Sequence, residues 1–143
     1  MATRNAEATW QGTLSEGNGN MKVGSGALDV PFSFKSRFTE GDPMTNPEEL
    51  IGAAHAGCFT MALNNRLFKE GLTPTRIHTV AHVQMGQTDA GTTITQIDLV
   101  TEGEVPGLDQ AAFAAHAEAT KDTCIVSRAL ASVPMTIQAT LNS

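Results

Sequence analysis

The chain contains two cysteines, Cys58 and Cys124, and their thiols are the most nucleophilic side chains it could offer. A thiol reacts as its thiolate, so a reactive cysteine needs a neighbouring group that favours the charged form. A free cysteine is also commonly a small hydrophobic residue of a core. From the residues alone, the two thiols are therefore a redox pair or unrelated packing residues.

Three arginines are candidates for the cation that Cys58 would need. The start of the helix expected to carry Cys58 lies about 16 Å away along the axis, and the effect of a helix N-terminus fades within a turn. Arg66 lies two turns further along and about 80° around the helix. Arg128 follows Cys124 by four residues and suits that thiol better. Arg37 is our candidate, although a solvated strand arginine would give the same pattern.

The segment 46–69 begins with a helix-capping sequence that gives two glutamates different roles. Asn46 can accept a hydrogen bond from the first turn, and a proline occupies the first helical position. Glu49 can return a bond and complete a capping box. Glu48 is then free to pair with Arg37, whose desolvation an opposite charge would offset.

Histidines offer two alternative kinds of chemistry. His55 precedes Cys58 by one helical turn, which is the pairing used by thiol hydrolases and acyl transferases. A hydrogen-bonded histidine near the core would give the same spacing. His78 and His82 share one face of an expected strand but lie about 13 Å apart, too far for one metal ion. We therefore expect no metal site.

Alternating apolar and polar residues predict an α+β fold with antiparallel sheet. The expected strands cover residues 7–14, 21–25, 28–38, 75–85, 92–102 and 133–141. The expected helices cover 46–69, 109–121 and 125–131, with a break at Thr123 and Cys124. Turns are expected at 17–20 and 89–91, and most connections are too short for parallel crossovers. We expect a single domain over residues 1–143.

Composition excludes several classes of partner. The net charge is −6 without a basic block, which argues against nucleic acids and anionic membranes. No apolar run reaches the length of a membrane span, and the first residues lack a signal-peptide pattern, so we expect a cytoplasmic location. The helix over 46–69 is apolar nearly all round, which predicts burial on nearly all sides and a partner subunit that completes it.

One run of residues resembles a known family. The segment TNPEELIGAAHAGCFTMAL, preceded by SRF, and the later Cys124 before Ile125-Val126-Ser127 resemble the osmotically inducible protein C (OsmC) family. This family is related to the organic hydroperoxide resistance proteins. The match runs from Trp10-Gln11-Gly12 through Val105-Pro106-Gly107 to the last strand. The resemblance implies an intertwined homodimer, with antiparallel sheets wrapped around long central helices, and a thiol-dependent peroxidase.

The resemblance also assigns roles to individual residues. It places the peroxidatic cysteine at Cys58, the resolving cysteine at Cys124, the active-site carboxylate at Glu48 and the active-site arginine at Arg37. A Cys58–Cys124 disulfide is the implied product of oxidation. The family commonly has proline after the second cysteine, where this chain has Ile125, which could alter the bend of the helix there.

The implied reaction sets the expected partners. The substrate would be an organic hydroperoxide, and an external dithiol, which the resemblance suggests is a lipoyl-bearing protein, would restore the thiols. We expect no cofactor and a role in oxidative or osmotic stress. Two alternatives remain: a cysteine hydrolase or acyl transferase that uses Cys58 and His55, and a stress-induced dimer without enzymatic activity.

Overall fold

The computed structural model describes residues 1–142. Contacts divide the chain into two compact units, Met1–Leu50 and Ile51–Ser143. The single domain expected over residues 1–143 stays a prediction. None of the helices in the described part of the chain is long and apolar enough to cross a membrane.

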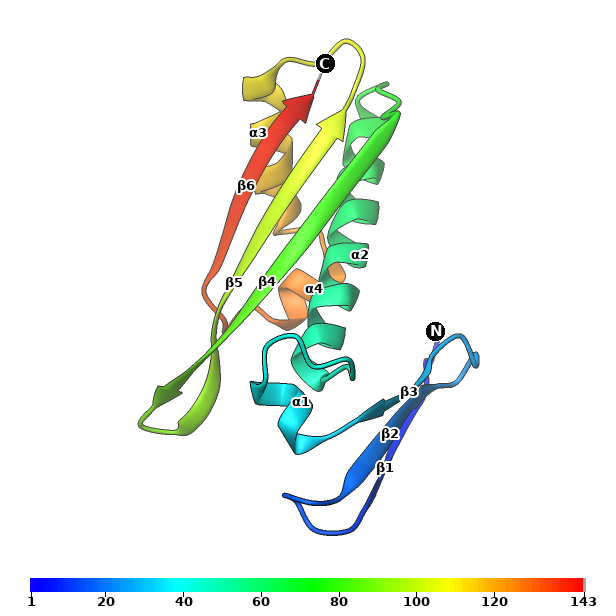
Figure 1. Cartoon of the computed structure of the whole chain (residues 1–143). Helices are drawn as coiled ribbons and strands as arrows, with labels where there is room; N and C mark the ends of the chain where they lie inside the picture. Colours follow the sequence, from blue (N-terminus) through cyan, green and yellow to red (C-terminus); the bar gives the residue numbers. More distant parts are fainter. Residues whose placement is uncertain (143) are drawn as a thin grey trace. The chain divides into compact units, whose positions relative to one another are not determined.

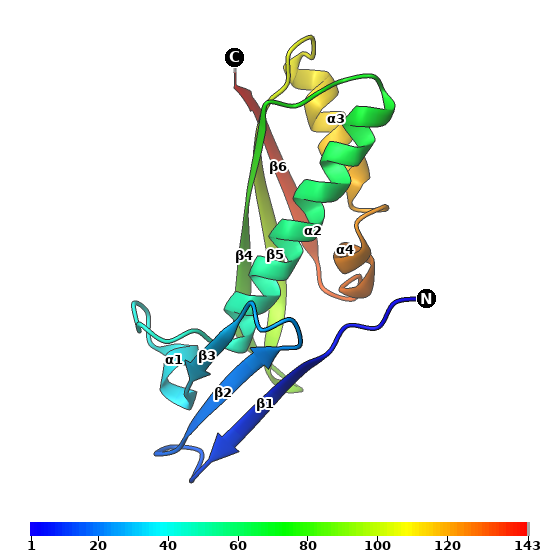
Figure 2. The ribbon, with the colours of Figure 1, turned by 90° about the vertical axis from the view of Figure 1, so that its right-hand side faces the viewer.

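The first unit contains a three-stranded antiparallel sheet in the order β1–β2–β3 (Figure 2). Its strands are β1 (Ala6–Gln11), β2 (Asn18–Val23) and β3 (Asp29–Phe32). The turn predicted at 17–20 is wrong, because residues 18–20 pair with β1 and residues 19–20 also pair with β3. The turn lies earlier and includes Gly12 at a φ of 91°. Pairing with neighbouring strands has overridden the weak strand propensity of asparagine and glycine.

The strand expected over 28–38 is wrong in its second half, where α1 (Phe34–Phe38) follows β3. Ser33 caps this helix, because its hydroxyl accepts a hydrogen bond from the Ser36 N–H at 3.1 Å. The Ser36 hydroxyl accepts one from the Ser33 N–H at the same distance. This capping box satisfies backbone groups locally, and the alternation of phenylalanines with polar residues did not reveal it. Arg37 therefore lies on a short helix and not on a strand.

The predicted long helix is confirmed as α2 (Pro47–Lys69). The Asn46 side chain accepts a hydrogen bond from the Glu49 N–H at 2.8 Å, as the capping sequence predicts. The Glu49 carboxylate accepts a bond from the Thr45 hydroxyl at 2.9 Å, in place of the predicted bond from the Asn46 backbone. Gly71 follows the end of the helix at a φ of 79°, as expected of a C-terminal cap.

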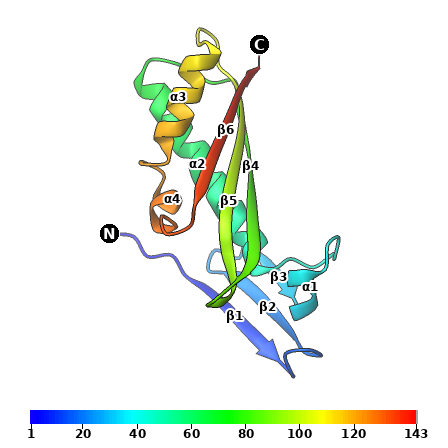
Figure 3. The same ribbon diagram turned by 90° about the vertical axis from the view of Figure 1, so that its left-hand side faces the viewer.

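The second unit combines a three-stranded sheet with helices on one of its faces (Figures 1 and 3). The hairpin of β4 (Arg76–Thr88) and β5 (Gly91–Glu104) is antiparallel, as predicted. The last strand, β6 (Met135–Asn142), pairs with β5 in parallel. The connection through α3 (Gln110–Thr120) and α4 (Ile125–Ala129) is long enough for that crossover. The α+β class is confirmed, but the sheet of this unit is mixed.

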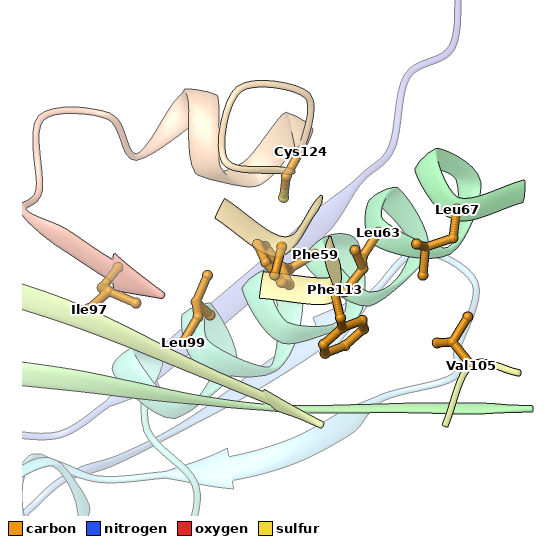
Figure 4. Close-up of a cluster of buried hydrophobic side chains, with 9 residues drawn as sticks. Phe59, Leu63, Leu67, Ile97, Leu99, Val105, Phe113 and Cys124 are labelled. Atoms are coloured by element: carbon orange, nitrogen blue, oxygen red, sulfur yellow. The ribbon is translucent and has the colours of Figure 1, made fainter. Parts of the chain in front are cut away.

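The core of the second unit lies between the sheet and the helices (Figure 4). Its fully buried members come from α2, β5, α3 and the turn before α4: Phe59, Leu63, Leu67, Ile97, Leu99, Phe113, Ala117 and Cys124. Cys58 is partly buried and packs against this cluster. One cysteine is thus part of the core, and the other lies at its margin.

One face of α2 is exposed in the single chain. The buried face carries Gly52, His55, Phe59, Leu63 and Leu67, spaced by three or four residues. The opposite face carries Ala54, Gly57, Met61, Asn64 and Phe68 at the same spacing. The side chains of Met61 and Phe68 are 75% and 69% exposed. Within one chain this face of α2 is uncovered, and its burial by a partner subunit stays a prediction.

Candidate active site

The two thiols come from segments far apart in the sequence and meet at the edge of the core. Cys58 lies in the middle of α2, and Cys124 is fully buried at the start of α4. Both are free thiols, and Cys58 is near enough to raise the pKa of Cys124.

Cys124 occupies the break that the sequence predicts between two helices. It is the N-cap of α4, with φ −70° and ψ 120°, and its sulfur accepts a hydrogen bond from the Ser127 N–H at 3.4 Å. Its own N–H donates to the Thr120 carbonyl at 2.9 Å. Ile125 follows at the first helical position, which is where proline is tolerated. The backbone of Cys124 is also in the region that a following proline favours, so Ile125 does not prevent this bend.

Opposing effects act on the ionisation of Cys124. Burial raises the pKa of its thiol above the ordinary value, and this is the largest effect. Hydrogen bonds from the side chain and backbone of Ser127 lower that pKa, whereas the hydrogen bond and the charge of Cys58 raise it. The net effect is a raised pKa, so Cys124 is a neutral thiol near pH 7.

His55 is buried on α2 and directed to Ser127. Its Nε2 lies 2.7 Å from the Ser127 hydroxyl oxygen. Its Nδ1 has no hydrogen-bond partner among residues 1–142. Burial lowers the pKa of His55, which keeps the imidazole neutral near pH 7. The hydrogen-bonded histidine near the core is thus confirmed, and its bond goes to Ser127 and not to Cys58.

Ser127 is the residue that sequence reasoning missed. It lies three residues after Cys124, which is the spacing at which a helix N-cap receives a backbone N–H. That spacing could have predicted the bond to the sulfur. The bond to His55 joins residues 72 positions apart and could not be read from local sequence.

Arg37 and Glu48 form an ion pair within the first unit. Arg37 Nε lies 3.1 Å from Glu48 Oε1 and donates a hydrogen bond to Oε2 at 3.2 Å. A neighbouring residue anchors this short helix, because the Ser36 hydroxyl donates to the Thr45 carbonyl at 2.7 Å. The Asn46 side-chain amide donates to the Ser36 carbonyl at 3.0 Å. These bonds tie α1 to the segment that starts α2.

The predicted division of the two glutamates agrees with this geometry. Glu49 makes hydrogen bonds to Thr45 and Asn46 at the start of α2, and Glu48 forms the ion pair with Arg37. The contact joins Nε of Arg37 to both carboxylate oxygens of Glu48. The Nη nitrogens of Arg37 have no hydrogen bond to protein in the described part of the chain, so they can bind another group.

The other candidate arginine of α2 has a different partner. Arg66 Nε donates a hydrogen bond to His116 Nδ1 at 3.1 Å. That bond holds α2 against α3 and agrees with the expectation that Arg66 is poorly placed for Cys58. No group of three potential metal ligands was found among residues 1–142.

Comparisons with known proteins place this fold and site in a family. The model of the OsmC-like protein family matches residues 39–138. The chain is 45% identical over 128 residues to peroxiredoxin OsmC of Escherichia coli (strain K12), covering 89% of each protein. The same values hold for peroxiredoxin OsmC of Shigella flexneri. The chain therefore belongs to the OsmC family, and the matched residues include Glu48 and both cysteines but not Arg37.

Solved structures share the fold at lower identity. An organic hydroperoxide resistance protein from Elizabethkingia anophelis superimposes with a TM-score of 0.76 at 23% identity, covering 99% of this chain and 98% of the other. The organic hydroperoxide resistance protein OhrB of Bacillus subtilis superimposes with a TM-score of 0.73 at 22% identity, covering 96% and 98%. At this identity the similarity establishes the fold.

The buried His55 predicts acid-sensitive stability. Its pKa is lowered in the folded state, so between that value and the unfolded pKa, about 6.5, the unfolded chain binds more protons. The free energy of unfolding should therefore decrease as the pH falls below about 6.5. Urea unfolding from pH 7.5 to 5 measures this decrease, and His55→Gln should reduce its slope. His78→Gln, on the exposed side of β4, is the control and should keep the wild-type slope; an unchanged slope in His55→Gln would contradict the assignment.

Proposed function

We propose that this chain is a thiol-dependent peroxidase that reduces organic hydroperoxides to alcohols. The observation that carries the proposal is the meeting of two free thiols from separate helices, one at the margin of the core and one inside it. The relatives named peroxiredoxin support the same reaction. The alternative hydrolase has no support from His55, whose hydrogen bond is made to Ser127.

The reaction proceeds in two oxidative steps and one reductive step. The Cys58 thiolate attacks the outer oxygen of the hydroperoxide, the O–O bond breaks, and the alcohol leaves after protonation of its alkoxide. Cys58 becomes a sulfenic acid. The Cys124 sulfur then bonds to the Cys58 sulfur, the S–O bond breaks, and water leaves. An external dithiol reduces the disulfide and is itself oxidised.

The charge of Cys58 gives these steps an order. Burial is the main cause of the raised pKa of Cys124, and the charge of a Cys58 thiolate raises it further. Oxidation to the neutral sulfenic acid removes this charge. Cys124 therefore becomes easier to deprotonate only after Cys58 has reacted. This order favours reaction of the hydroperoxide with Cys58 before any reaction at Cys124.

Arg37 and Glu48 are the proposed electrostatic part of the site. The guanidinium stabilises the Cys58 thiolate and then the alkoxide that develops on the leaving oxygen. Glu48 holds Arg37 by its Nε, which leaves the Nη donors free for this role. The pair lies at the start of the helix that carries Cys58, and the family resemblance assigns both residues to the site.

A homodimer would complete this site. Glu48 and Cys58 are ten residues apart on α2, which is about 15 Å along the helix axis. An arginine held on Glu48 is therefore almost three turns away from the thiol of its own helix. In a dimer built on paired α2 helices, the Arg37–Glu48 pair of one copy would serve Cys58 of the other.

The exposed stripe of α2 supports this pairing. Ala54 and Gly57 are small enough for a partner helix to approach closely, and space around Gly57 is open. Met61 and Phe68 add exposed apolar surface further along the same face. Contiguous apolar surface of this kind marks an interaction site.

The expected substrate and reductant follow from the same surface and chemistry. Cys58 lies at the margin of the hydrophobic core, so the alkyl part of a hydroperoxide would meet apolar side chains there. Each methylene buried contributes roughly 0.8 kcal/mol, which favours alkyl hydroperoxides over hydrogen peroxide. A dithiol, such as a lipoyl-bearing protein, is the proposed reductant. A cytoplasmic location in stressed cells would keep both thiols reduced.

The mass of the protein after one turnover tests the reaction. Reduced protein mixed with one equivalent of an alkyl hydroperoxide should lose two hydrogens as the disulfide forms. Cys124→Ser should gain one oxygen as a sulfenic acid, and Cys58→Ser should keep its mass because no peroxidatic thiol remains. Intact-mass spectrometry measures each species. A wild-type mass that does not change would favour the hydrolase or the non-enzymatic dimer and would refute the peroxidase.

Replacement of Arg37 tests the electrostatic role. Arg37→Lys keeps the positive charge but loses the planar set of donors, so the rate constant for reaction with hydroperoxide should fall about tenfold or more. Stopped-flow mixing under single-turnover conditions measures it. Lys35→Arg, an exposed position of the same short helix, is the matched control and should react at the wild-type rate. An Arg37→Lys rate equal to that of the wild type would remove Arg37 from the site.

A charge on the exposed face of α2 tests the dimer. Met61→Glu places a carboxylate in the proposed helix–helix interface, where its desolvation opposes association. Sedimentation at micromolar concentration should show a dimer for the wild type and mainly monomer for Met61→Glu. Gln138→Glu, which adds the same charge on the exposed face of β6, should remain dimeric. A monomeric wild type would contradict the proposed assembly.

A further inference from the structure

A chain of buried polar atoms leads from α2 to the Cys124 sulfur. His55 Nε2 lies 2.7 Å from the Ser127 hydroxyl oxygen. Ser127 donates its N–H to the Cys124 sulfur at 3.4 Å, and its side chain lowers the pKa of the Cys124 thiol. His55 and Cys124 are fully buried, and Ser127 is nearly so. The three residues connect two helices through groups that could each carry a proton.

Stability alone does not explain His55 at this position. A buried polar atom without a partner costs free energy, and His55 Nδ1 has none in the described part of the chain. A hydrophobic residue of similar size would fill the same space without that cost. The histidine therefore calls for a chemical explanation.

The second oxidative step supplies that explanation. Cys124 must lose its proton as its sulfur bonds to Cys58, yet its side chain is shielded from solvent. Bulk water cannot accept a proton directly from a buried thiol. An acceptor inside the protein is needed, and Ser127, whose backbone nitrogen lies 3.4 Å from that sulfur, also lowers the pKa of Cys124 through its side chain.

We propose that Ser127 and His55 form a relay that accepts the proton of Cys124 during disulfide formation. The inference rests on the proposed peroxidase function. As the S–S bond forms and the S–O bond of Cys58 breaks, the Cys124 proton passes to Ser127 Oγ, and the Ser127 hydroxyl proton passes to His55 Nε2. The departing hydroxide takes a proton from solvent and leaves as water, and His55 returns the relayed proton to Cys124 through Ser127 when the disulfide is reduced, so no further oxidant is needed. Ser127 contacts the reacting sulfur, and His55 is a positioning residue that acts through it.

The tautomer of His55 fits this role. To accept from Ser127, Nε2 must be unprotonated, so the proton of the neutral ring resides on the unpartnered Nδ1. Burial lowers the pKa of His55 and is the only cause of that shift, so no charged side chain of the described residues opposes neutrality. The titratable groups near the relay are the thiols of Cys58 and Cys124, and three charged residues that line a pocket together with Ser127: Lys121, Asp122 and Arg128. The relay is therefore ready to accept a proton near pH 7.

Single-turnover kinetics separate this step from the first. Reduced protein is mixed with an alkyl hydroperoxide, quenched at intervals, and scored by intact mass for sulfenic acid and disulfide. At pH 7, the rate constant from sulfenic acid to disulfide should fall about a hundredfold in Ser127→Ala and about tenfold or more in His55→Gln. Ser132→Ala, an exposed serine just after α4, and His78→Gln are the matched controls and should retain the wild-type rate constant.

The pH profile distinguishes a relay from a packing defect. In the wild type, the second step should be nearly constant around pH 7 and should slow below pH 6.5 as His55 is protonated. In the two variants it should instead increase with pH as Cys124 ionises without help, approaching the wild-type rate at alkaline pH. The wild-type profile tests the relay even if a variant fails to fold.

Two results would overturn the relay alone. One is a second step in both variants within threefold of the wild type at pH 7. The other is a wild-type rate that rises continuously with pH from 5 to 9, or variant rates reduced by the same factor at every pH. A wild type that forms neither sulfenic acid nor disulfide would overturn the peroxidase function and the relay with it.

Discussion

The burial of Cys124 against α2 is the constraint on which the rest of the site depends. A thiol at the edge of a core can meet an external hydroperoxide, whereas a thiol inside the core can meet only its neighbours. The break between α3 and α4 places the Cys124 sulfur at a helix N-cap and in contact with Cys58. The buried thiol is therefore limited by geometry to one partner, which is the property that a resolving cysteine needs.

The same burial creates the chemical problem that the neighbouring residues address. Desolvation disfavours the thiolate of Cys124, and the charge of Cys58 disfavours it further. Ser127 lowers the pKa of Cys124 through its side chain and its backbone N–H, and the Ser127 hydroxyl is in turn hydrogen-bonded to His55. In the proposed mechanism, Cys124 stays protonated as long as Cys58 is charged. After Cys58 is oxidised, the buried Ser127–His55 relay accepts the proton of Cys124.

α2 serves separate purposes on its different faces. One face packs into the core through Phe59, Leu63 and Leu67, and another presents small and apolar side chains to the exterior. The helix start holds Glu49 for capping and Glu48 for Arg37. Because one helix carries the capped start, the proposed peroxidatic thiol and the proposed dimer face, the proposal couples folding, catalysis and assembly through a single element.

The sequence by itself determined the features that depend on contacts within a few residues. The bounds of α2, the cap at Asn46, the division of roles between Glu48 and Glu49, and the break at Cys124 were all predictable. These features depend on hydrogen bonds between residues three or four apart, whose geometry a helix fixes. The pairing of Arg37 with Glu48 was also expected from the residues, whereas the pairing of Cys58 with Cys124 came from the family resemblance.

Tertiary structure decided the features that join distant segments. It also decided the segments where one local pattern favoured a strand and another favoured a helix. The alternation before Arg37 favoured a strand, but the capping box of Ser33 and Ser36, anchored on Thr45, produced α1. The parallel pairing of β6 with β5 and the bond between His55 and Ser127 depend on how α3 and α4 pack back onto the sheet and α2. Such contacts are selected by the packing of the whole core, so no local pattern could have specified them.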